Sequence, residues 1–248
     1  MTALEWDGCL NVRDLGGLPT AGGDLTRTGS VIRSDNVGGL TEHGWRALAD
    51  HGVVRIVDLR WSEEREGEVP PQVDVEVVHV PVLGESIDEE YIAELNASLD
   101  AVSDVADHYA WSYVDFLERF RDRFGRAFAA IADTDGTVVV HCAGGKDRTG
   151  LVSALLLRLA GVEIAVIGAD YALSEANLAP RGPAWIDGVE DELERERRRK
   201  LMRTPAEAMT KTLEELERRY GSVEDYLRSA GVDDHRIERL RARLAARP

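Results

Sequence analysis

The sequence predicts a small α/β sheet followed by a carboxy-terminal layer of helices. Two apolar, β-branched runs at 53–59 and 137–142 are typical of strands that are covered on both faces. From about residue 102 the apolar side chains recur with helical spacing, and beyond Gly161 the chain looks wholly helical. Strands that alternate with helices and then give way to helices alone indicate a sheet with a helical part at about 163–248.

Length and composition limit what this protein does. Its 248 residues, with 44% hydrophobic and 31% charged side chains, suit a single globular domain over residues 1–248. The formal net charge of −16 argues against a nucleic-acid partner, whereas an anionic substrate would need a locally positive pocket. The two cysteines, Cys9 and Cys142, are too few for a disulfide framework or a multi-cysteine metal site.

The sequence shows no transmembrane or export segment. Its longest apolar run, 151–157, is far shorter than the roughly 20 residues that cross a bilayer. The amino terminus lacks the basic and apolar stretches of a secretory signal. We therefore expect a cytoplasmic protein, unless export proceeds without such a signal.

Turns, strands and one capped helix are expected in the first part of the chain. Glycine and aspartate recur at 11–24, which is typical of turns. Thr41 caps a helix that ends at about Asp50, before Gly52. Strands are expected at 30–34, 53–59, 73–82 and 137–142, and a helix at about 85–98.

Aromatic residues mark the helical middle of the chain. Every fourth residue from Phe116 to Phe128 is a phenylalanine, which indicates one helical face turned toward the core. Gly125 is expected to bend or divide this helix. Further helices are expected at 149–160, 163–178, 183–202, 204–219, 222–230 and 233–246.

The chemical signal lies between Val140 and Gly150. Cys142 lies at the end of an expected buried strand. Five residues follow, and Arg148 lies at the start of an apolar helix. Cysteine is a nucleophile only as its thiolate, which the positive end of a helix and a fixed guanidinium both favour. The Thr149 hydroxyl can donate to the sulfur and favour the thiolate further. This placement predicts a reactive thiol at Cys142.

The residues after the cysteine suit an oxyanion. The small side chains of Ala143, Gly144 and Gly145 allow a tight loop whose backbone N–H groups point inward. The planar guanidinium of Arg148 can hold two phosphate oxygens, and Lys146 adds a second positive charge. The segment therefore predicts a phosphate-binding loop.

Other interpretations explain less of this segment. An ATP-binding loop requires Ser or Thr after its lysine, whereas Asp147 follows Lys146 here. A buried structural cysteine leaves the charges at 146–148 unexplained, and a rhodanese-like sulfur carrier has no need of them. Arsenate reduction usually enlists further cysteines, and here only Cys9 exists. A phosphate-binding module without turnover is disfavoured because a thiol, an arginine and an acid occur together.

The segment His141-Cys-Ala-Gly-Gly-Lys-Asp-Arg-Thr-Gly150 resembles the loop of the atypical bacterial cysteine-dependent tyrosine phosphatases. Further matches follow in order and extend the resemblance over about 5–240. They include Asn11-Val-Arg-Asp-Leu-Gly-Gly17, Arg33-Ser34, Asp58-Leu-Arg60 and Asp170-Tyr-Ala-Leu-Ser174. The resemblance implies the tyrosine phosphatase fold, a central, mainly parallel sheet flanked by helices with a helical carboxy-terminal layer or lid.

The resemblance also implies an activity. Phosphate monoesters, above all protein phosphotyrosine, would be hydrolysed through a cysteinyl-phosphate on Cys142, with no metal or cofactor. Backbone amides of the loop and Arg148 would stabilise the equatorial oxygens of the transition state. The alternative substrates are those of a dual-specificity or phosphoinositide phosphatase, including phosphorylated small molecules and lipids.

Roles for the neighbouring residues follow from the same resemblance. Asp147 is the favoured general acid, since related phosphatases also carry Asp before the loop arginine. Some relatives place an aspartate just after the strand that ends here at Pro81, where only Glu85 could substitute. His141 is expected to hydrogen-bond nearby backbone and hold the loop, and Asp58 to pair with Arg60 or the loop rather than act as an acid.

A run of basic residues, 195–203, has two interpretations. The first is a solvated helix with i,i+4 ion pairs, in which an acidic residue precedes each cation. These pairs would be Asp191–Arg195, Glu194–Arg198 and Glu196–Lys200. The second is a basic face on a lid helix that attracts a phosphoprotein or an inositol phosphate.

Overall fold

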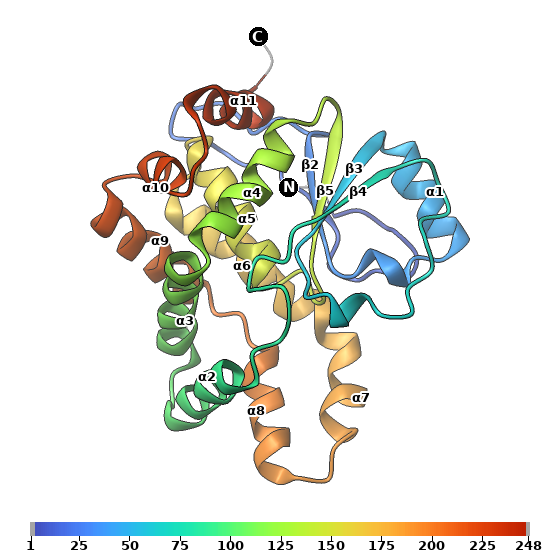
Figure 1. Cartoon of the computed structure of the whole chain (residues 1–248), viewed down its shortest axis with the longest axis vertical. Coiled ribbons are helices and arrows are strands. Elements are labelled where there is room, and N and C mark those ends of the chain that lie inside the picture. The colour runs from blue at the N-terminus through green and yellow to red at the C-terminus, as the bar shows by residue number, and fades with distance from the viewer. Residues whose placement is uncertain (1–2, 247–248) are drawn as a thin grey trace.

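The computed structural model describes residues 3–246 and shows a five-stranded sheet between helices (Figure 1). The strand order is β1-β2-β5-β3-β4, and only β1 runs antiparallel to its neighbour. The expected mainly parallel sheet is confirmed. The strands are β1 (Arg13–Asp14), β2 (Val31–Ser34), β3 (Val53–Asp58), β4 (Glu76–His79) and β5 (Thr137–His141).

Helices precede and follow the central strand β5. Those before it are α1 (Glu42–Asp50), α2 (Glu89–Ala101), α3 (Val105–Arg119) and α4 (Arg121–Ala132). Those after it are α5 (Arg148–Leu159), α6 (Ile164–Leu178), α7 (Gly182–Asp187), α8 (Glu192–Met202), α9 (Ala206–Tyr220), α10 (Val223–Ser229) and α11 (Asp234–Leu244). Short 3₁₀ helices lie at Val37–Gly39, Glu63–Arg65 and Ala179–Arg181. The expected carboxy-terminal helical layer is confirmed.

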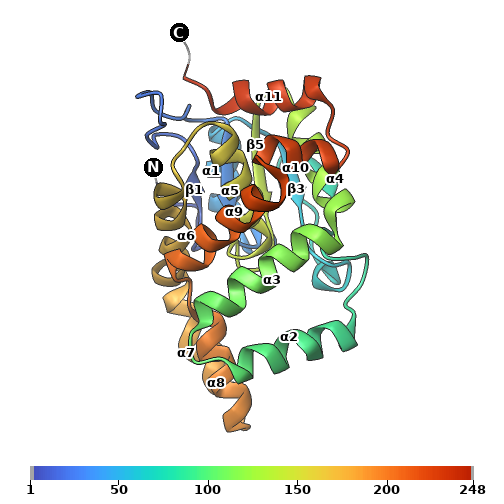
Figure 2. The same ribbon diagram turned by 90° about the vertical axis from the view of Figure 1, so that its left-hand side faces the viewer.

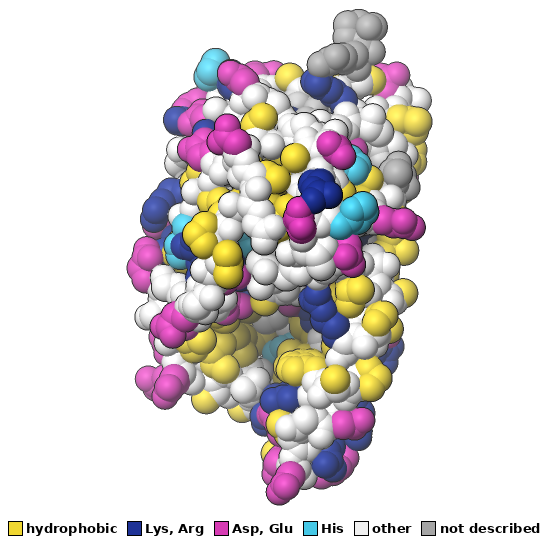
Figure 3. Space-filling model, turned by 90° about the vertical axis from the view of Figure 1, so that its right-hand side faces the viewer, with side chains coloured by type: hydrophobic (Ala, Val, Ile, Leu, Met, Phe, Trp, Pro, Cys, Tyr) yellow, Lys and Arg dark blue, Asp and Glu magenta, His cyan; other side chains and the backbone are white. Residues whose placement is uncertain are grey.

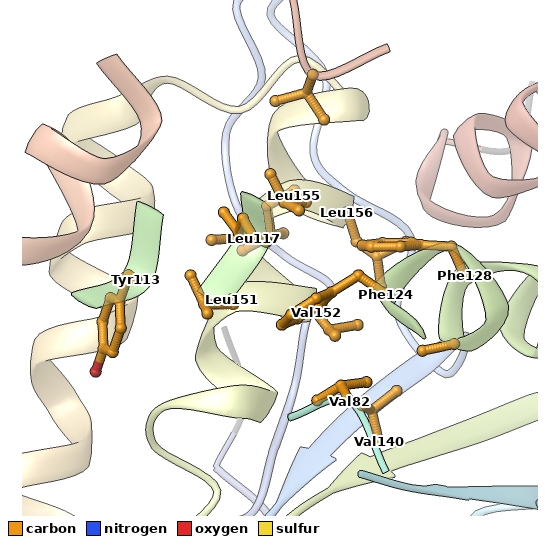
Figure 4. Packing of buried hydrophobic residues seen from close by; sticks show 14 of the residues in the cluster. Val82, Tyr113, Leu117, Phe124, Phe128, Val140, Leu151, Val152, Leu155 and Leu156 are labelled. Atoms are coloured by element: carbon orange, nitrogen blue, oxygen red, sulfur yellow. The ribbon is translucent and has the colours of Figure 1, made fainter. Parts of the chain in front are cut away.

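The sheet separates two apolar cores, because successive side chains of a strand point to opposite faces. Val138 and Val140 face the larger core, which contains most of the helices, and Val139 faces the smaller one beneath α1. In the larger core, the apolar helix α5 packs against phenylalanines of α4, including Phe124 and Phe128 (Figure 4). The expected aromatic stripe is therefore a core feature.

Gly125 does not divide the helices, contrary to the expectation from the sequence. The break lies at Phe120, which separates α3 from α4. A Cβ on Gly125 would lie 1.9 Å from the carbonyl oxygen of Ala230. The glycine therefore permits close approach of the chain that follows α10.

Two further boundaries differ from the expectation. The strand expected at 73–82 is shortened to β4, at the edge of the sheet. The helix expected at 183–202 is split into α7 and α8, because Asp191 caps α8 by accepting a hydrogen bond from the Glu194 N–H. Together α7 and α8 form an arm that projects beyond the end of the sheet (Figure 1).

The basic run lies on α8 except for Arg203, which follows its end, and only one of its predicted ion pairs forms. Glu194 and Arg198 pair at 3.0 Å. Arg195 pairs instead with Glu192, and Lys200 donates to carbonyl oxygens at the end of α2. The sequence could not reveal this last contact, because α2 reaches α8 only through the tertiary fold.

Helix α2 runs below α3 in the turned view and lies beside the α7–α8 arm (Figure 2). Between residues 3 and 246, no helix combines the length and hydropathy that a membrane crossing demands.

Candidate active site

The segment 142–147, here called the cysteine loop, joins the central strand β5 to α5. Cys142 follows directly on β5 and is 2% exposed. Arg148 is the first residue of α5, so its guanidinium and the helix amino terminus lie at the same end of the sheet. The structure thus brings the predicted thiol, arginine and helix start together.

The cysteine loop is held from one side, which we call its rear. The carbonyl oxygens of residues 143–145 each accept a hydrogen bond there. The donors come from the amino-terminal part of the chain: the Asn36 N–H to Ala143 at 3.1 Å, Asn11 Nδ2 to Gly144 at 3.0 Å and Arg33 Nη2 to Gly145 at 2.7 Å. In a trans peptide the C=O and N–H point in opposite directions. The N–H groups of residues 144–146 therefore face the other side, the front, where an oxyanion would be bound.

Gly145 is required by the geometry of the loop. Its φ is +63°, a conformation that favours glycine. A Cβ at this position would also lie 2.4 Å from the carbonyl oxygen of Ser34 in β2. The loop can pack this closely on β2 only because position 145 carries no side chain.

Four buried polar side chains, Asn11, Arg13, Arg33 and Asp170, form a rear network. Asp170 accepts from Arg13 Nε at 2.9 Å and from Arg33 Nη1 at 2.6 Å. Burial alone would raise the pKa of Asp170, but the two guanidinium groups outweigh burial and lower it. Burial and the neighbouring Arg33 lower the pKa of Arg13 to about 10. The ion pairs of this network join β1, β2 and α6 and support the cysteine loop from the rear.

Arg148 is clamped at the front by two residues that sequence reasoning missed. Its Nη1 and Nη2 donate to the two carboxylate oxygens of Glu64 at 2.5 and 2.8 Å. Its guanidinium lies 4.7 Å from the centre of the Trp61 ring. Burial alone would raise the pKa of Glu64, but its hydrogen bonds with Arg148 lower it. Because Glu64 binds only the two terminal nitrogens of the Arg148 guanidinium, the edge of the guanidinium that carries Nε does not contact Glu64.

Lys146 turns away from the loop toward α3 and α8. Its Nζ donates to the Tyr109 hydroxyl at 3.0 Å and to the carbonyl oxygen of Leu201 at 2.5 Å. Burial would lower the pKa of Lys146, but the adjacent carboxylate of Asp147 at 3.3 Å raises it. Lys146 thus joins the cysteine loop to the last turn of α8.

The Asp147 carboxylate lies at the front, at the start of α5. It accepts a hydrogen bond from the Tyr113 hydroxyl, which lies 2.8 Å from the hydroxyl of Tyr171. Burial and the nearby carboxylate raise the pKa of Tyr113, so its hydroxyl stays a donor. The sequence pattern did not assign Tyr113 to the site.

Glu85, the alternative acid, is placed differently. Its side chain is 65% exposed and pairs with Arg123 at 2.8 Å. Hydrogen bonding to Arg123 lowers the pKa of Glu85, which favours the ionised form. Asp147, in contrast, lines a cavity together with Arg148.

His141 and Asp58 lie beneath the cysteine loop. Asp58 binds Arg60 with both oxygens, at 2.9 and 2.7 Å, and one oxygen lies 3.6 Å from His141 Nε2. Burial opposes the ionised form of Asp58, but the hydrogen bonds of Arg60 lower its pKa to about 2. Burial lowers the pKa of His141 to about 4, so the imidazole is neutral near pH 7. Its Nδ1 lies 3.4 Å from the Cys142 carbonyl oxygen.

The Thr149 hydroxyl and the Cys9 thiol are two further polar groups. The Thr149 hydroxyl is buried and has no hydrogen-bond partner among residues 3–246. Burial raises the pKa of Cys9 to about 12, so this second thiol stays protonated. The described part of the chain contains no cluster of three or more His, Cys, Asp or Glu side chains arranged to hold a metal ion.

Three features define the protein tyrosine phosphatase class. They are a cysteine at the end of a central parallel strand, a loop whose backbone N–H groups face the front, and an arginine at the start of the next helix. Comparison with known families agrees with this class. The model of the tyrosine phosphatase family matches residues 4–246, so the chain belongs to that family and is a phosphatase.

Named relatives cover most of the chain. A tyrosine-protein phosphatase of Nostoc commune is 31% identical over 87% of this chain and 74% of its own length. A putative tyrosine-protein phosphatase of Cupriavidus necator is 31% identical over 92% of this chain and 83% of its own length. The triple specificity protein phosphatase PtpB of Mycobacterium tuberculosis is 26% identical over 98% of this chain and 99% of its own length. The resemblance expected from the sequence is confirmed.

Proposed function

We propose that this phosphatase hydrolyses phosphate monoesters by covalent catalysis on Cys142. The observation that carries the proposal is the orientation of the cysteine loop, whose carbonyl groups are bound at the rear and whose amides face the front. Those amides and Arg148 surround the position that three equatorial phosphate oxygens would occupy beside the thiol. Ala143, Gly144 and Gly145 supply backbone to this phosphate-binding loop, and so does Lys146, although its ammonium is bound by Tyr109 and Leu201 and does not face the front as expected. Thr149, in the first turn of α5, is the remaining proposed member.

The proposed reaction has two steps. The Cys142 thiolate forms a bond to phosphorus while the ester P–O bond breaks, and Asp147 gives its proton to the departing oxygen. Water then attacks phosphorus and yields a proton to the Asp147 carboxylate, while the S–P bond breaks and releases phosphate and the thiolate. His141 and Asp58 support the loop from beneath, and no residue role in this scheme requires a metal or a cofactor.

Asp147 is the proposed acid because of its position. It lies at the front beside Arg148, and the Tyr113 hydroxyl fixes its carboxylate. Glu85 is held by Arg123 and is exposed. Position thus favours Asp147, and a proton on it would be delivered directly to the leaving oxygen.

Protein phosphotyrosine is the proposed substrate. The names of the relatives from Nostoc commune and Cupriavidus necator support this choice, and the name of PtpB supports broader specificity as the second candidate. We further propose that residues 1–248 act as one phosphatase domain, and that the protein works in the cytoplasm, where a reducing environment keeps Cys142 from being oxidised.

Hydrolysis of p-nitrophenyl phosphate in the presence of EDTA tests the mechanism. We expect turnover in the unmodified protein, none above background in Cys142→Ser, and unchanged turnover in the matched control Cys9→Ser. Undiminished turnover in Cys142→Ser would remove the nucleophile from the proposal. Loss of activity on adding EDTA would contradict a metal-independent reaction.

A further inference from the structure

A cavity of about 270 Å³, here called the α2 cavity, opens beside the front of the cysteine loop. Asp147 and Arg148 lie at its polar end, next to the rings of Trp61 and Tyr113. Its far wall is α2, which contributes side chains in helical register: Tyr91, Ile92, Leu95 and Leu99. The space-filling view shows the molecule hollowed between its body and the α7–α8 arm, with hydrophobic side chains on the walls of the hollow (Figure 3). The walls of the cavity are mainly apolar, and Asn96 of α2 and His108 and Ser112 of α3 are the polar exceptions away from the loop.

Contacts with α8 hold the wall that α2 forms. Lys200 Nζ donates to the carbonyl oxygens of Leu99 and Val102 at 3.0 Å each, which caps the end of α2. Arg197 pairs with Asp100 at 2.7 Å. Because α8 is itself bound through Leu201 to Lys146, the loop and the α2 wall keep a defined separation.

The cations near this cavity have partners. Among the described residues that line it, Arg148 is the one Lys or Arg, and it is paired with Glu64. The basic side chains of α8 and its end are bound to carboxylates or carbonyl oxygens: Arg195, Arg197, Arg198, Arg199, Lys200 and Arg203. A second phosphate group on a substrate would therefore enter a mainly apolar space without an unpaired Lys or Arg, which costs free energy.

We propose that the α2 cavity is a specificity subsite for an apolar side chain next to the phosphorylated residue, and that it disfavours polyphosphorylated head groups. The inference rests on the proposed function, because it takes the phosphate to lie at Arg148. The basic-face interpretation of the run 195–203 predicts the opposite preference. Charge pairing on α8 favours the apolar substrate.

Size supports the same occupant. Small-molecule pockets typically enclose about 300–1,000 Å³, so a cavity of about 270 Å³ is small. It suits one ring with a neighbouring aliphatic side chain better than the two acyl chains of a lipid. The subsite therefore fits a phosphotyrosine peptide with leucine or phenylalanine beside the phosphorylated residue.

The test compares two phosphotyrosine peptides of equal length and charge, one flanked by Leu and Phe and the other by Ser and Asn. A soluble dihexanoyl phosphatidylinositol bisphosphate is the third substrate. In the unmodified protein we expect kcat/KM for the apolar peptide to exceed that for the polar peptide roughly tenfold or more. The inositide is expected to be the poorest of the three. Equal values for the two peptides, or an inositide as good as the apolar peptide, would overturn the proposal.

Substitutions of Leu95 in the α2 wall distinguish the effect of lost apolar contact from the effect of an added charge. Leu95→Asn should remove the tenfold peptide preference, and Leu95→Lys should remove it and raise the rate on the inositide. Ala97→Lys adds the same charge to an exposed position of α2 and should leave all ratios unchanged. A preference that Leu95→Asn and Leu95→Lys both retain would show that α2 does not contact the substrate.

Binding to Cys142→Ser distinguishes failure of the subsite from failure of the proposed function. Calorimetric titration of this variant with the two peptides should show the same preference without turnover. Preferential binding in a protein that hydrolyses no monoester would retain the subsite and reject the function. Hydrolysis of p-nitrophenyl phosphate that depends on Cys142, with no peptide preference in rate or binding, would reject the subsite and retain the function.

Discussion

The rear and the front of the cysteine loop are built from different kinds of contact. At the rear, Asp170 lies between Arg13 and Arg33 in a network whose charged groups are at most 2% exposed. At the front, Glu64 and Asp147 remain partly open to solvent, with side chains 21% and 38% exposed. The rear therefore sets the shape of the loop, whereas the two front carboxylates, which we propose lie next to the substrate, are more open to solvent. Disturbing the rear should cost folding free energy, and disturbing the front should cost rate.

The largest expected effect is at the rear. Asp170→Asn would leave Arg13 and Arg33 buried without a carboxylate, which typically costs about 3–5 kcal/mol. We expect the free energy of unfolding in urea to fall by this amount and phosphatase activity to fall with it. Asp133→Asn, which removes a carboxylate from an exposed pair with Arg236, should cost no more than about 1 kcal/mol. Equal losses in the two variants would show that the rear network is not the stronger support.

At the front, Asp147→Asn should affect chemistry selectively. Loss of a general acid typically slows a reaction about 10²- to 10⁴-fold, and the loss is smaller when the leaving group needs no proton. We expect kcat for phenyl phosphate to fall at least about 100-fold and kcat for p-nitrophenyl phosphate to fall far less. Glu85→Gln is the matched control and should leave both rates unchanged. Equal losses on both substrates would assign Asp147 to orienting the loop.

Beneath the loop, His141 should make stability depend on pH. Its ordinary pKa of 6.5 is lowered to about 4 by burial in the folded protein. Between these values the unfolded chain binds a proton that the folded chain does not, so stability falls as the pH falls from 6.5 toward 4. Each unit of difference is worth 1.36 kcal/mol, so this group should contribute a loss on the order of 2 kcal/mol by pH 4.5.

Unfolding midpoints in urea at pH 7 and pH 4.5 measure this loss. His141→Asn should lose less stability over the interval than the unmodified protein. The exposed control His43→Asn should lose as much as the unmodified protein. Parallel curves for His141→Asn and the unmodified protein would contradict the assignment.

The smallest expected effect is on the clamp of Arg148. Glu64→Gln keeps the shape of the side chain but removes its charge, so the guanidinium should be held less firmly. We expect kcat/KM for p-nitrophenyl phosphate to fall roughly tenfold, which corresponds to about 1.4 kcal/mol, and inhibition by inorganic phosphate to weaken. The neighbouring Glu66→Gln should change neither. Tighter phosphate inhibition in Glu64→Gln would mean that Glu64 competes with the substrate for Arg148.

Local patterns account for what the sequence revealed. The strand that leads to Cys142 and the helix that begins at Arg148 follow from the short segment around them. The apolar runs predict strands covered on both faces, and the mainly parallel sheet was implied by the family resemblance. The partners of these residues come from distant parts of the chain. Glu64 lies 84 residues from Arg148, and Asp170 lies 157 residues from Arg13. Nothing in the local pattern distinguishes Glu64 from its acidic neighbours, because only the tertiary fold selects the one that reaches the guanidinium.

Predictions were wrong where a tertiary contact replaced the local preference of a residue. Gly125 was expected to bend or divide a helix, since glycine weakens helices. The structure uses the same residue to admit the Ala230 carbonyl oxygen. Likewise, Lys200 was expected to pair with Glu196 but caps α2. In both cases the sequence shows the residue and its ordinary local role, and packing assigns it another.

Position 145 has a consequence for protein engineering and for divergence. Any side chain there would have to displace the Ser34 carbonyl of β2, since its Cβ would start 2.4 Å from that oxygen. A substitution would therefore become tolerable only together with a shift of the neighbouring strand. Libraries that vary the loop to change substrate choice should hold this glycine constant and place their diversity on α2.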